Sequence, residues 1–152
     1  MLASFPLCQG ARMTADLRIE IETPNPADMN AVAMQLAAYN ASKSGGEMPD
    51  YLFIAARDAE GAIRGGVVGG TYLGWLSIQV FTLEESLRGQ GHGRRMMQLA
   101  EEEAVRRGCP RVFLETLSFQ ALPFYEKLGY QVHSKLEGFP PGGTRYALTK
   151  ML

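Results

Sequence analysis

One segment limits the fold more than any other, because a strand pattern, a glycine-rich turn and a helix pattern follow one another in residues 74–104. The apolar run 74–83 is typical of a largely buried strand. Alternating glycines come next, and small and apolar residues then recur at helical spacing. The glycines are Gly89, Gly91 and Gly93, and the helix positions are Met97, Ala100 and Ala104. The sequence therefore predicts a strand that passes through a tight turn into a helix.

The patterns along the rest of the chain predict one mixed domain. Their order is a strand, a helix, three strands, a helix, a strand, a helix and two strands. Asn25 is the expected cap of the first helix, and Pro26 fits its first turn. This order favours an α/β or α+β sandwich around a mixed sheet and excludes a regular doubly wound fold. Besides the segment above, we expect strands at 17–23, 51–58, 62–73, 111–117, 130–136 and 144–152, and helices at 26–41 and 121–129.

Composition excludes several classes of protein. A formal net charge of −1 over 152 residues gives no electrostatic case for binding nucleic acid. No apolar run approaches the ~18 residues of a membrane-spanning helix. The two cysteines lack metal-ligand spacing, so we expect no metal site and a reduced, cytoplasmic location. We interpret residues 1–15 as an N-terminal extension and residues 16–152 as a single domain.

The glycine-rich turn admits two interpretations, a plain turn or a cradle for an anion. The first N–H groups of a helix lack internal partners, and the helix dipole adds about half a positive charge there. Glycine lets a ligand approach the backbone closely. Arg88, Arg94 and Arg95 add charge, so the cradle is favoured, with phosphate as the best-suited anion. The spacing matches neither a P-loop nor a dinucleotide-binding fingerprint.

The motif RGQGHG fits the R/Q-x-x-G-x-G/A signature and resembles that of the GNAT superfamily of N-acetyltransferases. FTLEESLRGQGHGRRMMQLAEEEAVRRGC is similar to the family's strand–loop–helix motif, and FLETLSFQALPFYEKLGYQV resembles the strand and helix that follow it. The resemblance covers about residues 16–152. It implies a mostly antiparallel sheet of six to seven strands flanked by helices and splayed between the fourth and fifth strands, 74–83 and 111–117. It also implies acetyl-CoA as co-substrate.

The resemblance also implies which residues would hold acetyl-CoA. The backbone of Phe81 and Leu83 would pair with the pantetheine arm beside the splayed strand. A backbone N–H on the same strand would polarise the thioester carbonyl. The N–H groups of the loop and helix start would bind the pyrophosphate. These loop residues are Arg88, Gly89, Gln90, Gly91, His92, Gly93 and Arg94.

By the same resemblance, Tyr125 is the general acid that protonates the departing thiolate. The chemistry fits, because a phenol with a pKa of about 10 can donate to a thiolate of similar basicity. The alternative is that Tyr125 only packs in the core. Tyr130 is expected to be a core residue.

The sequence does not identify the general base. The strand 75–81 carries no acid, although many family members place a carboxylate there. Glu115 on the next strand is the nearest substitute by topology, and it could instead be paired with an arginine. Glu84 and Glu85 could act through water, and a water chain with no dedicated base is a further alternative.

Two functions follow from these expectations. The first is acetyl transfer from acetyl-CoA to a primary amine of a small molecule or a peptide, by direct attack on the thioester. The second is an acyl-CoA-binding sensor or decayed enzyme, which the missing strand acid would favour. The sequence does not identify the acceptor. The terminal strand 144–152 suggests a homodimer, because such strands often pair between subunits.

Overall fold

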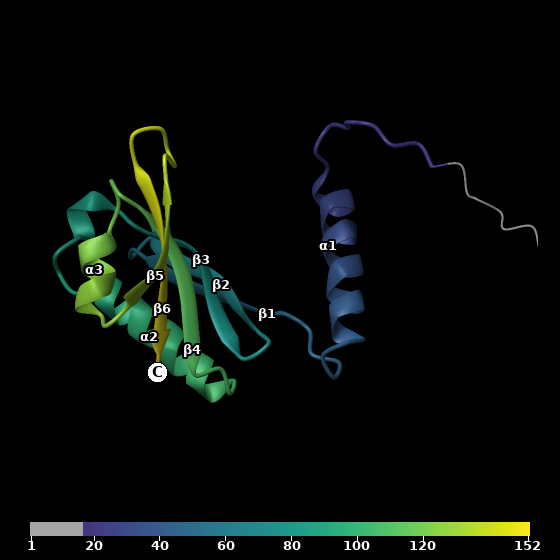
Figure 1. Ribbon diagram of the computed structural model, residues 1–152. Helices are drawn as coiled ribbons and strands as arrows, with labels where there is room; N and C mark the ends of the chain where they lie inside the picture. Colours follow the sequence, from purple (N-terminus) through teal and green to yellow (C-terminus); the bar gives the residue numbers. More distant parts are fainter. Residues whose placement is uncertain (1–16) are drawn as a thin grey trace, which may run out of the picture.

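A computed structural model describes residues 17–152, which form a six-stranded sheet with helices (Figure 1). The strand order is β1-β2-β3-β4-β6-β5, and all neighbours are antiparallel except the parallel pair β3 and β4. No helix within the described range is long and apolar enough to cross a membrane. The elements are α1 (Pro26–Ala41), β1 (Asp50–Arg57), β2 (Ile63–Tyr72), β3 (Trp75–Leu83), the 3₁₀ helix η1 (Glu85–Leu87), α2 (His92–Arg106), β4 (Arg111–Leu117), α3 (Leu122–Lys127), β5 (Gln131–Glu137) and β6 (Thr144–Met151).

The expected α+β class and most of the expected elements are confirmed. Asn25 caps α1, because its side-chain oxygen accepts a hydrogen bond of 2.9 Å from the Ala27 N–H, and Pro26 is the first residue of the helix. The predicted strand at 17–23 is wrong, since these residues form no strand. A strand needs a neighbour to satisfy its backbone, and this segment does not lie beside the sheet. The predicted extension at 1–15 lies outside the described residues.

α2 and α3 cover one face of the sheet, and the core lies between this face and the two helices. Alternate side chains of β1 to β4 and of β6 enter this layer, as the two-residue period of a strand requires, and β5 adds Val132. Met96, Met97, Ala100 and Ala104 of α2 pack against them. The fully buried strand side chains are Val67, Leu76, Val112, Leu114 and Leu148. We call the opposite side of the sheet the open face, because neither α2 nor α3 covers it (Figure 1).

A bulge in β3 determines which of its side chains reach the core. Val68 pairs with Val80 but Gly69 pairs with Ile78, so Gln79 is the extra residue. Such a bulge shifts the alternation of side chains by one position. Ile78 faces the core before the bulge, and Phe81 faces it after the bulge.

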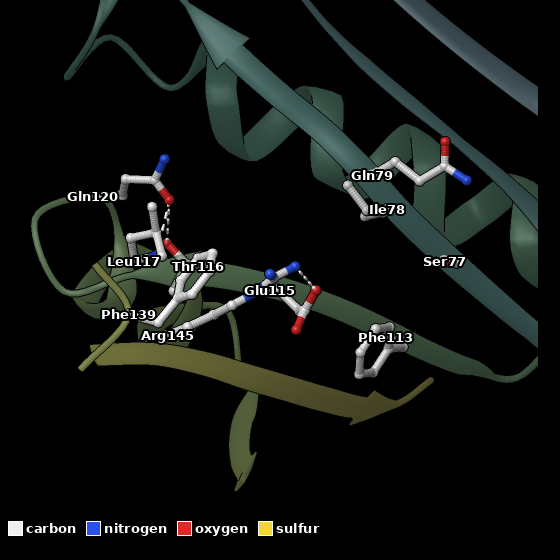
Figure 2. A pocket seen from close by; sticks show the side chains of 10 residues that line it. All are labelled: Ser77, Ile78, Gln79, Phe113, Glu115, Thr116, Leu117, Gln120, Phe139 and Arg145. Atoms are coloured by element: carbon white, nitrogen blue, oxygen red, sulfur yellow. Dashed lines mark hydrogen bonds and ion pairs between the residues drawn. The ribbon is translucent and has the colours of Figure 1, made fainter. Parts of the chain in front are cut away.

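The predicted splay lies between β3 and β4. These strands pair only from Trp75 to Ile78, opposite Arg111 to Leu114. Beyond Ile78 the side of β3 that faces β4 has no strand partner in the described part of the chain, and Figure 2 shows the two strands diverging there. The backbone of residues 79–83 is therefore available to a ligand on that side, because β2 pairs with its other side.

The C-terminal strand does not have the free edge that we expected for a dimer. β6 lies between β4 and β5 and pairs with both along its length. The two edges of the sheet are formed by β1 and β5. Pairing between subunits through a free edge of β6 is therefore ruled out as the basis of the predicted homodimer, and the homodimer itself stays a prediction.

Candidate active site

The glycine-rich loop leaves a row of backbone N–H groups without partners. Gly89 and Gly91 have φ angles of 75° and 87°, in the left-handed region that favours glycine. Gly91 caps α2, and the first helical hydrogen bond runs 3.0 Å from the Arg95 N–H to the Gly91 carbonyl. Within residues 17–152, the N–H groups of 89–94 have no protein acceptor. The loop thus offers consecutive donors at the positive end of a helix dipole.

Side chains around the loop hold its shape and add positive charge. The Arg88 Nε donates a hydrogen bond of 3.0 Å to the Leu83 carbonyl, which ties the loop to the end of β3. The Gln90 side chain donates to the Ser86 carbonyl at 2.9 Å. Arg94 is exposed and forms no ion pair with any residue from 17 to 152. The local charge therefore favours an anion.

An aromatic cluster joins the end of β3 to the start of α2 and to α3. The rings of Phe81 and Phe124 stack with centroids 5.6 Å apart, and the Tyr125 ring lies edge-on at 6.3 Å from Phe81. A Cβ on Gly93 would lie 3.3 Å from the Phe81 Cζ and 3.5 Å from the Phe124 Cζ. Gly93 therefore also serves packing, because these two rings lie against its Cα. Gly93→Val would therefore disturb this packing as well as the loop.

Tyr125 is 5% exposed and packs in this cluster. Burial raises the pKa of its hydroxyl to about 12, so the group keeps its proton throughout the neutral range. Near neutral pH a phenol in this state holds the proton that a general acid needs, and its raised pKa makes it a weaker acid than an exposed phenol. Tyr130 is also buried, as expected, and its hydroxyl donates to the Glu101 carboxylate at 2.9 Å.

A cavity of about 450 Å³ lies where β3 and β4 diverge (Figure 2). The Glu115 carboxylate accepts a hydrogen bond from Arg145 of β6 inside it. Both side chains are partly exposed, at 37% and 38% respectively, so a ligand can reach either of them. The residues that line the cavity are Ser77, Ile78, Gln79, Phe113, Glu115, Thr116, Leu117, Gln120, Phe139 and Arg145.

The structure separates the three carboxylates that we considered as bases. Glu115 alternates with the buried Leu114 and Thr116 and so points to the open face, away from the core where Tyr125 packs. Glu84 pairs with Arg64 at 3.0 Å and lines a different cavity of about 520 Å³ near the start of α2. Glu85 is exposed in η1. Glu115 is thus the one of the three that lies in the cavity at the splay.

Sequence patterns missed Gln79 and Arg145. Gln79 stands out only through the bulge, which depends on the register with β2. Arg145 meets Glu115 through the pairing of β4 with β6, thirty residues apart along the chain. No local pattern of residue types signals either position.

Comparison with known proteins agrees with this geometry. The model of the acetyltransferase (GNAT) family matches residues 18–130. Acetyltransferase Atu2258 of Agrobacterium fabrum is 37% identical over 100 residues, which cover 66% of this chain and 73% of that protein. Blasticidin-S acetyltransferase of Streptomyces morookaense is 36% identical over 93 residues, which cover 60% of this chain and 68% of that protein.

A solved structure shows the same similarity in three dimensions. The crystal structure of a protein assigned as an acetyltransferase from Agrobacterium tumefaciens superposes with a TM-score of 0.80 at 31% identity. The match covers 90% of this chain and 99% of that one. Together with the splayed strands and the glycine-rich helix start, these similarities show that the chain belongs to the GNAT family of N-acetyltransferases.

Proposed function

We propose that the protein moves the acetyl group of acetyl-CoA directly to the primary amine of a small molecule. The observation that carries this proposal is the row of unpartnered N–H groups at residues 89–94, next to the unpaired side of β3. Phosphate groups suit the row of N–H groups, and an extended arm that contains amides suits the unpaired backbone of β3. The GNAT family uses acetyl-CoA, whose coenzyme part contains both groups.

The proposed reaction forms a C–N bond and an S–H bond, breaks the C–S bond and removes two protons from the amine nitrogen. The amine nitrogen, having lost a proton, attacks the thioester carbonyl and forms the new C–N bond. Backbone N–H groups on the free side of β3 stabilise the charge that develops on the oxygen. The C–S bond then breaks, and the proton of the Tyr125 hydroxyl passes to the leaving sulfur. The nitrogen loses its first proton before the attack, through Glu115 or water, and it loses its second after the C–N bond forms, which restores the Tyr125 hydroxyl.

The cavity at the splay supports a small acceptor that carries an ammonium group. Glu115 offers a carboxylate to this group, and Gln79 and Gln120 offer amide groups to other polar atoms. Phe139 lies against the Arg145 guanidinium, 5.1 Å from ring centroid to carbon, and borders the cavity. One relative is named for acetylation of blasticidin S, which also supports a small-molecule acceptor for this chain. A cytoplasmic location remains a prediction from the cysteine pattern.

Glu115→Gln is expected to lower kcat/KM for the amine by about 10-fold to 100-fold. Hydrogen bonds to charged groups are worth about 1.5–3 kcal/mol, and the amide cannot accept a proton. Steady-state kinetics with varied amine would measure the effect, and the dissociation constant of acetyl-CoA should not change. Glu84→Gln and Glu85→Gln are the controls. An equal loss in either control, with none in Glu115→Gln, would show that Glu115 is not the group that meets the amine.

Acetyl-CoA is expected to stabilise the folded protein. At a concentration one hundred times its dissociation constant, linkage adds about 2.7 kcal/mol to the free energy of unfolding. Thermal unfolding with acetyl-CoA, CoA, ATP and NAD would measure this. The first two should raise Tm and the last two should not. A rise with ATP or NAD alone would contradict the proposed co-substrate.

A screen for the acceptor tests the function itself. Thiol release from acetyl-CoA would be followed with amino acids, polyamines, aminonucleosides, aminoglycosides and peptides. Amine-dependent release with at least one small molecule is expected. If only peptides support release, the acceptor class is wrong. If no amine does so although acetyl-CoA binds, the protein is a binding module.

A further inference from the structure

Helix α1 stands apart from the sheet, although its composition is that of a buried helix (Figure 1). Its sixteen residues include one charged side chain, Asp28. Such a helix is expected to be covered by other protein. No strand and neither of the other helices packs extensively against α1 within the described part of the chain. Its exposed stripe, at positions one helical turn or two apart, consists of Met29, Val32, Leu36 and Tyr39, which are 61–67% exposed.

The open face of the sheet is the matching uncovered surface. Apolar side chains of three neighbouring strands are exposed there, and aromatic rings dominate the edge near β1. Contiguous exposed surfaces of this kind mark places where another protein segment binds. The exposed residues are Tyr51, Phe53, Val68, Trp75 and Val80.

A third unsatisfied feature lies N-terminal to α1. Leu17, Ile19 and Ile21 alternate with charged residues as in a strand, yet they are 80–102% exposed. The outer side of β1 meanwhile has no partner strand among residues 17–152. One chain therefore carries an unpaired strand pattern and a free sheet edge, as well as an apolar helix and an apolar sheet face.

We propose that two copies of the chain exchange residues 17–41. In this dimer, α1 of each copy covers the open face of the other, and residues 17–23 pair with the free edge of the other copy's β1. The exchange is symmetric, so every contact forms twice. In both copies the open face is then covered and the free edge of β1 is paired. It would also border the cavity at the splay, because Glu115 and Phe113 point to the same open face.

The connection between α1 and β1 favours exchange over folding back onto the same chain. Its first residues continue the helix end with hydrogen bonds from the Ser42 N–H to the Ala38 carbonyl and from the Gly46 N–H to the Ala41 carbonyl. The Glu47 carboxylate then accepts a bond of 2.6 Å from the Leu73 N–H, in the turn between β2 and β3. Folding α1 back would require this ordered connection to open. Exchange leaves it intact.

The similarity to the Agrobacterium tumefaciens structure points the same way. Residues 50–152 make up about two thirds of this chain and about three quarters of the matched residues. The match covers 90% of this chain and 99% of that one, so it extends to residues before β1. With a TM-score of 0.80 over this range, it supports the placement of these residues outside their own sheet.

Cross-linking between two different chains tests the exchange. One chain carries a cysteine on the stripe of α1, for example Val32→Cys, and the co-expressed chain carries Phe53→Cys. Both carry Cys8→Ser, and the buried Cys109 stays. The stripe is sampled in turn with Met29→Cys, Leu36→Cys and Tyr39→Cys. Each pair is treated with a short bismaleimide, and peptide masses identify the joined residues.

We expect a native mass of about twice 16.7 kDa and a covalent link between α1 of one chain and Phe53→Cys of the other. A single chain carrying both cysteines should then also link between chains. A monomeric native mass, a link confined to one chain, or a link from α1 to α1 would overturn the exchange, as would no link at any of the four positions.

A charge on the stripe gives a second, independent test. Leu36→Asp is expected to weaken dimerisation at least 10-fold, because the carboxylate would be buried without a partner. Asn30→Asp adds the same charge on the opposite side of the helix and should leave the dimer unchanged. Circular dichroism would confirm that both variants fold. Equal dimer stability in the two variants would contradict the proposal.

Discussion

Tyr125→Phe is expected to lower kcat by about 10²–10⁴-fold while the affinity for acetyl-CoA changes little. The substitution removes one oxygen and keeps a ring that packs against Phe81, Phe124 and Tyr130, so the fold should survive. An interaction made only in the transition state lowers kcat and kcat/KM together, whereas a lost binding contact raises KM. Steady-state kinetics on the acceptor found by the screen would measure both parameters.

The pH dependence of the activity should show that Tyr125 stays protonated during the reaction. Since burial raises its pKa to about 12, the hydroxyl stays protonated as the pH rises through the neutral range. Activity should therefore rise with pH as the amine loses its proton, and it should not fall through loss of the Tyr125 proton below about pH 11. Tyr130→Phe is the matched control, because it removes a buried hydroxyl of the same cluster that donates to Glu101. Turnover of Tyr125→Phe within threefold of the unmodified protein would refute the general acid.

Gly91→Val is expected to weaken acetyl-CoA binding by at least about 10²-fold with little effect on the core. Among the described residues the Cβ would meet no atom within 4 Å, so the added side chain would project into open space at the start of α2, where acetyl-CoA is proposed to bind. The left-handed φ angle adds strain of about 1–2 kcal/mol. Calorimetric titration with acetyl-CoA would measure the loss of affinity.

Gly108→Val is the control that separates the effect of backbone strain from the effect of blocking acetyl-CoA. Gly108 follows the other end of α2, and it has a φ angle of 75° and open space around its Cβ position. The two variants should lose similar amounts of stability, while only Gly91→Val loses acetyl-CoA. If Gly91→Val binds acetyl-CoA normally, the loop is a plain turn.

Local patterns predicted the parts of the fold that depend on neighbouring residues. Asn25 and Pro26 specify the start of α1 because capping uses only the first turn. The loop from Gly89 to Gly93 was predicted as an anion cradle, since a helix start offers N–H donors whatever surrounds it. The donors at 89–94 are unpartnered within residues 17–152, and their binding of an anion stays a prediction.

Features that depend on register or on a second surface could not be predicted in this way. The bulge at Gln79 arises from pairing with β2, and the ion pair of Glu115 with Arg145 arises from pairing with β6. Residues 17–23 have the right alternation for a strand, but alternation does not supply the neighbouring strand that a sheet requires. The same limit applies to the terminal strand, whose position between β4 and β5 removes the edge that a dimer would need.

Product balance tests the central claim, direct acetyl transfer to an amine, most directly. The protein would be incubated with acetyl-CoA, with and without the acceptor, and mass spectrometry would follow the protein, CoA and the acceptor. We predict equal amounts of acetylated amine and free CoA when the amine is present, and neither CoA release nor a change in protein mass when it is absent. One CoA released per protein without amine, together with an acetyl group gained by the protein, would contradict direct transfer.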